Sequence, residues 1–386
     1  MKSSRTRQIQ EQAPEAETLQ QLAIGLAESG CRVEDAFWEH KLDTALGQVF
    51  EDGDENLLTT ALDGLYEKQQ RAYDVLADCI ESRAEQSAGA SGVLLIAAPV
   101  LAWSRFAIPA GRIPAAIIQD LRVHLQAHVF AEGVQLGLAD TLFSPDQLPQ
   151  GYCETARFTS VMSSPTNTEG VLKVDEKSLP ETGRFLSDVR YVLAAVKAGK
   201  GQPLFRWQET DGSRAQALMQ WKKQGLPCLA PMLPGCAVDL ELPDAFFAAC
   251  RQADRASRPF SIKASAAFLS TTLEVEAGAL RAIVASFRDH QIEELRIGFT
   301  LADNNDVVHG VVWPLLGPEE ESAEAIIQID AALKENGITL IEHLDQRFPL
   351  EYCDDCGAPM YPSPEGEPAH AELPEKNAEQ VPRHLH

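Results

Sequence analysis

Two cysteines near the C-terminus are the residues whose types and spacing best suit chemistry. Cys353 and Cys356 are separated by two residues within the stretch EYCDDCGAPMYPSPEGE, residues 351–367. Two thiolates at this spacing can bind one tetrahedral zinc ion from a single tight turn. Gly357 follows the second cysteine, and a glycine tolerates the positive φ that such a turn requires. The spacing therefore predicts a zinc site with Cys353 and Cys356 as ligands.

Two other roles are compatible with the same cysteines: a redox dithiol and inert surface thiols. A redox C-x-x-C motif opens a helix, whose dipole lowers the pKa of the first thiol. The stretch GAPMYPSPEGEP after Cys356 is too rich in proline and glycine to form that helix. Asp354 and Asp355 also disfavour a second negative charge unless a cation compensates it. Both observations favour metal over redox chemistry, and inert thiols remain an alternative.

A zinc site needs four ligands, and one C-x-x-C pair supplies two of them. The others would come from histidines of the tail, from cysteines elsewhere in the fold, or from the identical pair of a second copy in a homodimer. The candidates within the chain are His370, His384, His386, Cys228 and Cys236.

No other sequence motif indicates catalysis or cofactor binding. The chain has no G-x-x-x-x-G-K-[ST] phosphate loop, no G-x-G-x-x-G, no G-x-S-x-G and no H-E-x-x-H. His124 and His128, one helical turn apart, are interpreted as residues near a helix end. The stretch ADNND, residues 302–306, is interpreted as a hairpin turn. The sequence therefore predicts no catalytic and no cofactor-binding residue.

Composition and charge exclude several classes of protein. The chain has 386 residues and a net charge of −24, so its surface repels nucleic-acid backbones and anionic membranes. The longest apolar run, residues 93–103, contains Pro99 and is about half the roughly 20 residues that cross a bilayer. The N-terminus has no apolar signal-peptide region. These features predict a cytoplasmic protein whose eight cysteines are mostly reduced thiols.

The N-terminal part is predicted to be helical. Residues 1–14 are polar and are expected to be disordered. Residues 15–90 are expected to form a unit of four helices, because apolar residues such as Leu19, Leu22, Ala23 and Leu26 recur at helical spacing. A linker over residues 85–92, EQSAGASG, closes this unit.

Residues 91–257 are predicted to form an α/β half that carries a long surface loop or insertion at residues 139–182. The insertion is rich in Ser, Pro, Thr and Asp and shows no sustained periodicity. The expected strands cover residues 92–103, 129–138 and 203–207, with short strands near Cys228 and Val238, and the expected helices cover 113–125, 184–197, 213–223 and 243–254.

Residues 258–350 are predicted to form a ferredoxin-like half in the order βαββαβ. Its strands are expected at residues 260–269, 294–301, 307–315 and 338–344, and its helices at 278–290 and 317–337. A possible duplication would make the first half ferredoxin-like too, since 104–124 resembles 271–290 and 134–140 resembles 295–303. The predicted fold class is α+β: a helical unit, one or two ferredoxin-like (βαββαβ) α/β sandwich halves, and an irregular C-terminal tail over residues 351–386 that carries the CxxC motif.

One family resemblance accompanies these patterns. The motif LEYCDDCGAPMYPSPEGEPAHAELPE, residues 350–375, the chain length and the acidic half before the motif resemble a betaproteobacterial family defined only as a domain of unknown function. The resemblance covers essentially the whole chain and is most specific at the cysteines. It implies a bacterial cytoplasmic protein, and it implies no activity, substrate or catalytic residue.

Two hypotheses for function follow. The first is a non-enzymatic cytoplasmic protein that senses a ligand or binds a partner protein, with a zinc-stabilised C-terminal knuckle; ferredoxin-like units commonly bind regulatory ligands. The second is an enzyme whose site lies between the two α/β halves, with residues 139–182 as a lid. Arg157, Thr159 and Ser160 would be the residues to test there. Neither hypothesis identifies the small molecule, the protein partner or the reaction.

Overall fold

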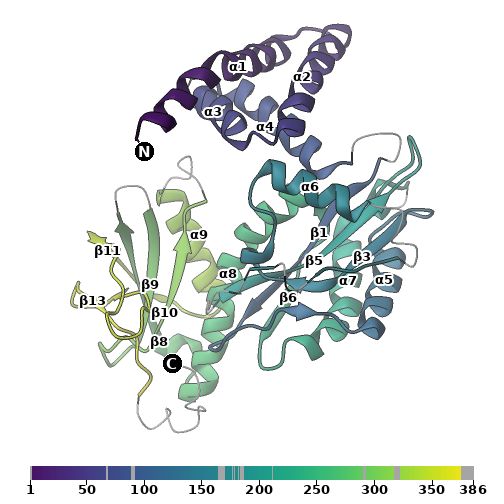
Figure 1. The fold of residues 1–386 in the computed structure, drawn as a ribbon. Helices are drawn as coiled ribbons and strands as arrows, with labels where there is room; N and C mark the ends of the chain where they lie inside the picture. The colour runs from purple at the N-terminus through teal and green to yellow at the C-terminus, as the bar shows by residue number, and fades with distance from the viewer. Residues whose placement is uncertain are drawn as a thin grey trace.

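The computed structural model has three parts: a helical unit, a first sheet covered by helices on both faces, and a second sheet with the C-terminal segment beside it (Figure 1). It describes residues 2–66, 68–87, 92–163, 170–175, 177, 179–180, 182, 187–210, 212–289, 293–316 and 322–374. The predicted α+β class and the N-terminal helical unit are confirmed. None of the helices in these ranges is long and apolar enough to cross a membrane.

The helical unit packs around one cluster of leucine side chains. Leu42, Leu58 and Leu76, from three different helices, are fully buried in it. The expectation of disorder over residues 1–14 is not met where the structure describes them, because the first helix begins at Lys2 and extends through Pro14. Gln, Glu and Arg, which favour helices, make up much of that stretch. The four helices are α1 (Lys2–Glu28), α2 (Arg32–Asp52), α3 (Glu55–Tyr66) and α4 (Gln70–Glu85).

The first sheet has the ferredoxin-like topology. Its four main strands follow the order β3-β5-β1-β6, and all neighbouring pairs are antiparallel. Helices α5 and α7 alternate with these strands in the order βαββαβ, and α6 (Tyr152–Met162) is inserted between the second and third strands. The ferredoxin-like unit therefore lies in the first half of the α/β region. Its elements are β1 (Leu94–Trp103), α5 (Ala115–His128), β3 (Gln135–Phe143), β5 (Ser187–Lys197), α7 (Arg214–Leu229) and β6 (Ala237–Leu240), and β2 (Gly111–Arg112), β4 (Val171–Leu172) and β7 (Asp244–Ala245) are short additions.

Both faces of this sheet are covered, which explains several wrong predictions. In β5, Val192 packs on the α5–α7 side while Leu193 packs on the opposite side. A strand buried on both faces has a continuous apolar sequence, which resembles a buried helix, so the predicted helix over 184–197 is wrong. The predicted insertion is also wrong in part, because β3 continues to Phe143 and α6 (Tyr152–Met162) covers the second face. The predicted strand at 203–207 contains only a single bridge, between Phe130 and Phe205.

One long helix, α8 (Phe246–Leu273), connects the two sheets. Ala249 and Ala253 pack on the first sheet, and Ile262, Ala266 and Leu269 pack on the second. The predicted strand over 260–269 is wrong, because the buried residues recur at helical spacing. The helix passes through Pro259, which lacks the N–H that would bond to the preceding turn.

The second sheet is not ferredoxin-like. Its order is β10-β9-β8-β11, a three-stranded antiparallel meander with the last strand parallel to β8. The predicted helix over 278–290 is a strand, so the predicted βαββαβ order is wrong for this half, and the similarity to 104–124, which ends in a helix, reflects no shared structure. The elements are β8 (Leu280–Arg288), β9 (Glu293–Leu301), β10 (His309–Pro314), α9 (Ser322–Glu335) and β11 (Leu340–Pro349).

The C-terminal segment covers the face of the second sheet on which the described residues form no helix. Helices α8 and α9 cover one face of the second sheet, where Phe299 and Trp313 are buried. On the opposite face the chain returns as the short hairpin β12 (Tyr361–Pro362) and β13 (Pro368–Ala369). The predicted irregular tail is therefore partly ordered, and residues 375–386 lie outside the described part of the chain.

Candidate metal centre

The two cysteines lie on the tight turn that their spacing predicts. The N–H of Gly357 donates to the Cys353 carbonyl at 2.8 Å, and the N–H of Cys353 donates to the Ala358 carbonyl at 2.8 Å. Gly357 has φ 71°, and no neighbouring atom lies near the position of an added Cβ. This glycine is therefore required by the backbone conformation of the turn and not by lack of space.

The same turn favours the thiolate form of the first cysteine. The backbone N–H of Cys356 donates to the thiol group of Cys353, and with the N–H of Asp355 it lowers the pKa of Cys353 below its ordinary value. Hydrogen bonds to a charged form stabilise that form. Because metals bind the thiolate, the backbone of the turn prepares Cys353 to act as a ligand.

His370 joins the two cysteines from the returning arm of the segment. The β12–β13 hairpin reverses the chain so that His370, directly after β13, faces the cysteine turn. The ligand atoms of Cys353, Cys356 and His370 all lie within 4.8 Å of one another, and Cys356 Sγ is 3.3 Å from His370 Nε2. His370 Nδ1 lies 3.2 Å from the Glu372 carboxylate, the kind of partner that orients a metal-bound imidazole.

Two thiols and one imidazole are a donor set that can hold a metal ion. Of the candidate ligands named from the sequence, His370 is brought to the cysteines. Cys228 and Cys236 are not, since both pack against the core of the first sheet. Burial raises the pKa of both of these thiols, which disfavours the thiolate that a metal would need. His384 and His386 lie outside the described residues.

A buried arginine ties both ends of the cysteine turn to the second sheet. Arg296 in β9 is fully buried, and its Nη1 donates to the carbonyls of Glu351 and Met360, each at 2.7 Å. These two residues flank the turn and are themselves joined by a backbone hydrogen bond of 3.1 Å. The Nε of Arg296 forms an ion pair of 2.6 Å with Glu294. Charge-assisted bonds of this kind are stronger than neutral ones, so the turn is held firmly at its base.

Two glycines make room for the hairpin on the sheet. Gly298 and Gly310 are directly opposed partners in β9 and β10. A Cβ on Gly298 would overlap the Pro362 carbonyl oxygen, and a Cβ on Gly310 would overlap the Tyr361 ring. A glycine within a strand often indicates close approach of another backbone, and this was the sequence signal that could have located the hairpin.

The residues considered for an enzyme site do not converge. Arg157, Thr159 and Ser160 lie on α6, which is a helix and not a lid loop. The hydroxyl of Thr159 is buried and donates to the carbonyls of Ala84 and Thr155 at 3.0 and 2.8 Å. Its contacts hold α6 against α4, which is a structural role.

Comparisons with known proteins identify a family and no individual relative. No curated protein and no solved structure matches the chain. A family model described as "Protein of unknown function (DUF2863)" matches residues 4–384, which is nearly the whole sequence. The chain therefore belongs to the DUF2863 family.

Proposed function

We propose that this chain is a non-catalytic binding protein of the cytoplasm whose C-terminal segment is fastened by a zinc ion. The observation that carries the proposal is the convergence of Cys353, Cys356 and His370 from two arms of one segment. Thiolate and imidazole donors together suit zinc better than they suit magnesium or calcium. The acidic composition and the eight free thiols support a reducing, cytoplasmic setting.

A fastening role suits the position of the metal centre better than a catalytic one. Three cavities in the described part of the chain are lined by residues other than Cys353, Cys356 and His370. A metal ion there would link the cysteine turn to the arm that follows β13. The segment buries few side chains, with Tyr361 the main one, so this link would supply much of its order. Three protein ligands leave one tetrahedral position for water, for a residue beyond the described part, or for a second copy of the chain.

Metal content tests this proposal. Protein purified without added metal and without a histidine tag is expected to contain about one zinc per chain by plasma mass spectrometry. The Cys353→Ser and His370→Ala variants should each lose most of it. Cys31→Ser, which removes an exposed thiol far from the site in sequence, should retain it. About one zinc per two chains would instead indicate a site shared in a homodimer.

The opposing result is equally clear. Wild-type protein that contains no metal, and whose Cys353 and Cys356 both react freely with a thiol reagent, would rule out the zinc centre. The segment would then be held by its hydrogen bonds to Arg296 and by the packing of the hairpin on the sheet, without a metal.

A further inference from the structure

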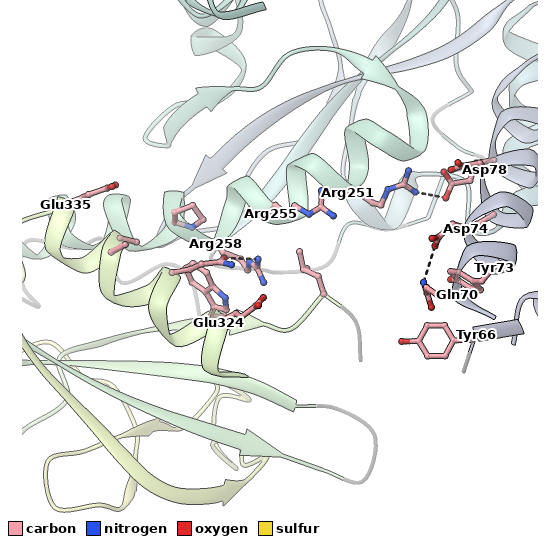
Figure 2. A pocket seen from close by; sticks show the side chains of 18 residues that line it. Tyr66, Gln70, Tyr73, Asp74, Asp78, Arg251, Arg255, Arg258, Glu324 and Glu335 are labelled. Carbon is pink, nitrogen blue, oxygen red and sulfur yellow. Dashed lines mark hydrogen bonds and ion pairs between the residues drawn. The ribbon is translucent and has the colours of Figure 1, made fainter. Parts of the chain in front are cut away.

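A large groove lies where the helical unit, α8 and the second half of the molecule meet (Figure 2). Its volume is about 1120 Å³, and its walls come from α4 on one side and from α9 and the end of β10 on the other. Helix α8 forms the floor. The groove contains none of the metal-ligand candidates, so it is a separate site.

Three arginines form a row along the floor. Arg251, Arg255 and Arg258 are spaced by four and three residues, which places them on one face of α8. The first has a structural role, because Arg251 forms an ion pair of 2.5 Å with Glu81 of α4. It therefore holds the helical unit against α8.

The last arginine of the row also has a structural role, because it contacts the end of β10 in the second sheet. Arg258 is 5% exposed, and its guanidinium lies 4.8 Å from the centre of the Trp313 ring. It also donates to the Pro314 carbonyl at 3.1 Å. These contacts fix the end of β10 against α8.

The middle arginine is different. Arg255 is exposed and extends between its two neighbours into the open groove, as Figure 2 shows. Among the described residues, no acceptor or ring forms a hydrogen bond, ion pair or stacking contact with its side chain. A guanidinium offers five donors in a planar fork that matches a carboxylate. The side chain of Arg255 is thus already positioned to donate hydrogen bonds to an acidic group of a ligand.

The walls determine which acidic ligands can enter. Asp74 and Asp78 of α4 face the floor from one side, and Glu324 and Glu335 of α9 face it from the other. With Glu81 the lining has five carboxylates against three guanidinium groups. A polyanion such as a nucleotide would be repelled by this excess of negative charge. A ligand that carries both signs of charge can satisfy Arg255 and the acidic walls together.

The volume of the groove and its aromatic lining further limit the ligands that it can bind. The groove is larger than the roughly 300–1,000 Å³ that is typical of small-molecule pockets, so it suits an extended ligand. Tyr66 at the end of α3 and Tyr73 on α4, with ring centres 5.3 Å apart, provide aromatic surface at its edge.

We propose that the groove binds a short peptide segment with both acidic and basic side chains, and that Arg255 holds a carboxylate of that segment. The proposal rests on the proposed role as a binding protein and gives that role a ligand class. The basic side chains of the peptide would lie against Asp74 and Glu324.

An array of short synthetic peptides tests the proposal on the full-length protein. The array permutes Glu, Lys and Leu, and it includes all-Glu and all-Lys peptides for comparison. Wild-type protein is expected to select mixed-charge peptides. Arg255→Ala should weaken their binding by about tenfold to a hundredfold, the usual effect of losing a charged hydrogen-bonding partner. Arg255→Lys, which keeps the charge and loses the fork, should fall between the two.

A matched control and the metal assay make the result decisive. Lys263→Ala removes an exposed cation from the same helix outside the groove and should not change binding. Selection of all-Glu peptides, or binding that Arg255→Ala leaves unchanged, would overturn the proposal, as would the absence of any bound peptide. Zinc content measured on the same samples separates failure of the groove from failure of the zinc centre.

Discussion

At the scale of single residues, the second sheet is shaped for the segment that covers it. Arg296 reaches both ends of the cysteine turn, and Phe287 and Tyr352 flank its guanidinium with ring centres 4.4 and 5.1 Å away. The opposed glycines Gly298 and Gly310 leave a trough for the hairpin. A buried cation and a glycine pair are costly in an ordinary strand. Both become favourable because the C-terminal segment supplies the missing contacts.

Gly298→Ala tests this residue-scale interpretation. The added Cβ would overlap the Pro362 carbonyl oxygen, a backbone atom that cannot move without displacing β12. We expect a destabilisation of about 1–3 kcal/mol, typical of overpacking, localised in faster amide hydrogen exchange over residues 351–374. Gly30→Ala, where no atom lies within 4 Å of the new Cβ, is the control. Unchanged exchange in Gly298→Ala would show that the hairpin does not depend on this contact.

At the scale of elements, two carboxylates dock the helical unit onto helix N-termini. Glu55 of α3 accepts from the N–H groups of Tyr152 and Cys153 at the start of α6, each at 2.8 Å. Glu85, at the end of α4, accepts from the N–H of Phe247 at the start of α8, at 3.3 Å. The first N–H groups of a helix lack partners within it, and its dipole favours negative charge there. Each carboxylate thus joins the helical unit to a helix that covers the first sheet.

The Glu85 junction predicts a dependence of stability on pH. Burial raises the pKa of Glu85 from 4.5 to about 7, and Glu81 adds to this while the Phe247 N–H and Arg251 oppose it. Between those two pH values the folded protein binds more protons than the unfolded chain, so stability falls as the pH rises through this window. Glu85→Gln removes the charge. It should increase the free energy of unfolding near pH 8 by up to about 3 kcal/mol, and so raise the melting temperature.

Melting temperatures of Glu85→Gln and wild type, measured near pH 5.5 and near pH 8, test this prediction. Near pH 5.5 Glu85 is mostly protonated in the folded protein, so Glu85→Gln and wild type should melt alike. Glu17→Gln, at an exposed position of α1, should match wild type at both values. An equal gain for Glu85→Gln at both pH values would contradict the ionisation argument.

The helices and strands also show how much of the fold could be predicted from the sequence. Helices with one apolar face, such as α3 and α9, were located correctly because their periodicity is clear. β5 was mistaken for a helix because residues buried on two sides lose that periodicity. Part of α8 was mistaken for a strand because apolar and polar residues also alternate in FSIKASAAFL, residues 260–269. The cysteine turn was predicted from local spacing. The groove was not, because α4, α8 and α9 meet only through tertiary contacts.

At the scale of the whole molecule, the parts have separate cores. The helical unit, the two faces of the first sheet and the inner face of the second sheet each bury their own hydrophobic cluster. Helix α8 contributes to two of these clusters, so it fixes the sheets relative to each other. The candidate ligands Cys353, Cys356 and His370 belong to none of these four clusters. They lie with the C-terminal segment on the outer face of the second sheet, where Ala285, Phe287 and Phe348 form a smaller cluster of their own. A disturbance at this site should therefore remain local to that face.

Chelation tests this locality. Removal of the proposed zinc ion should speed amide exchange in residues 351–374 and in the outer face of β9 (Glu293–Leu301), because the hairpin is released from Gly298. Exchange in α1–α4 and in the first sheet should not change, and mixed-charge peptides should still bind the groove. The Cys353→Ser variant, treated alike, should show no further effect. Loss of protection in the helical unit would mean that the metal supports the whole fold, in place of one segment.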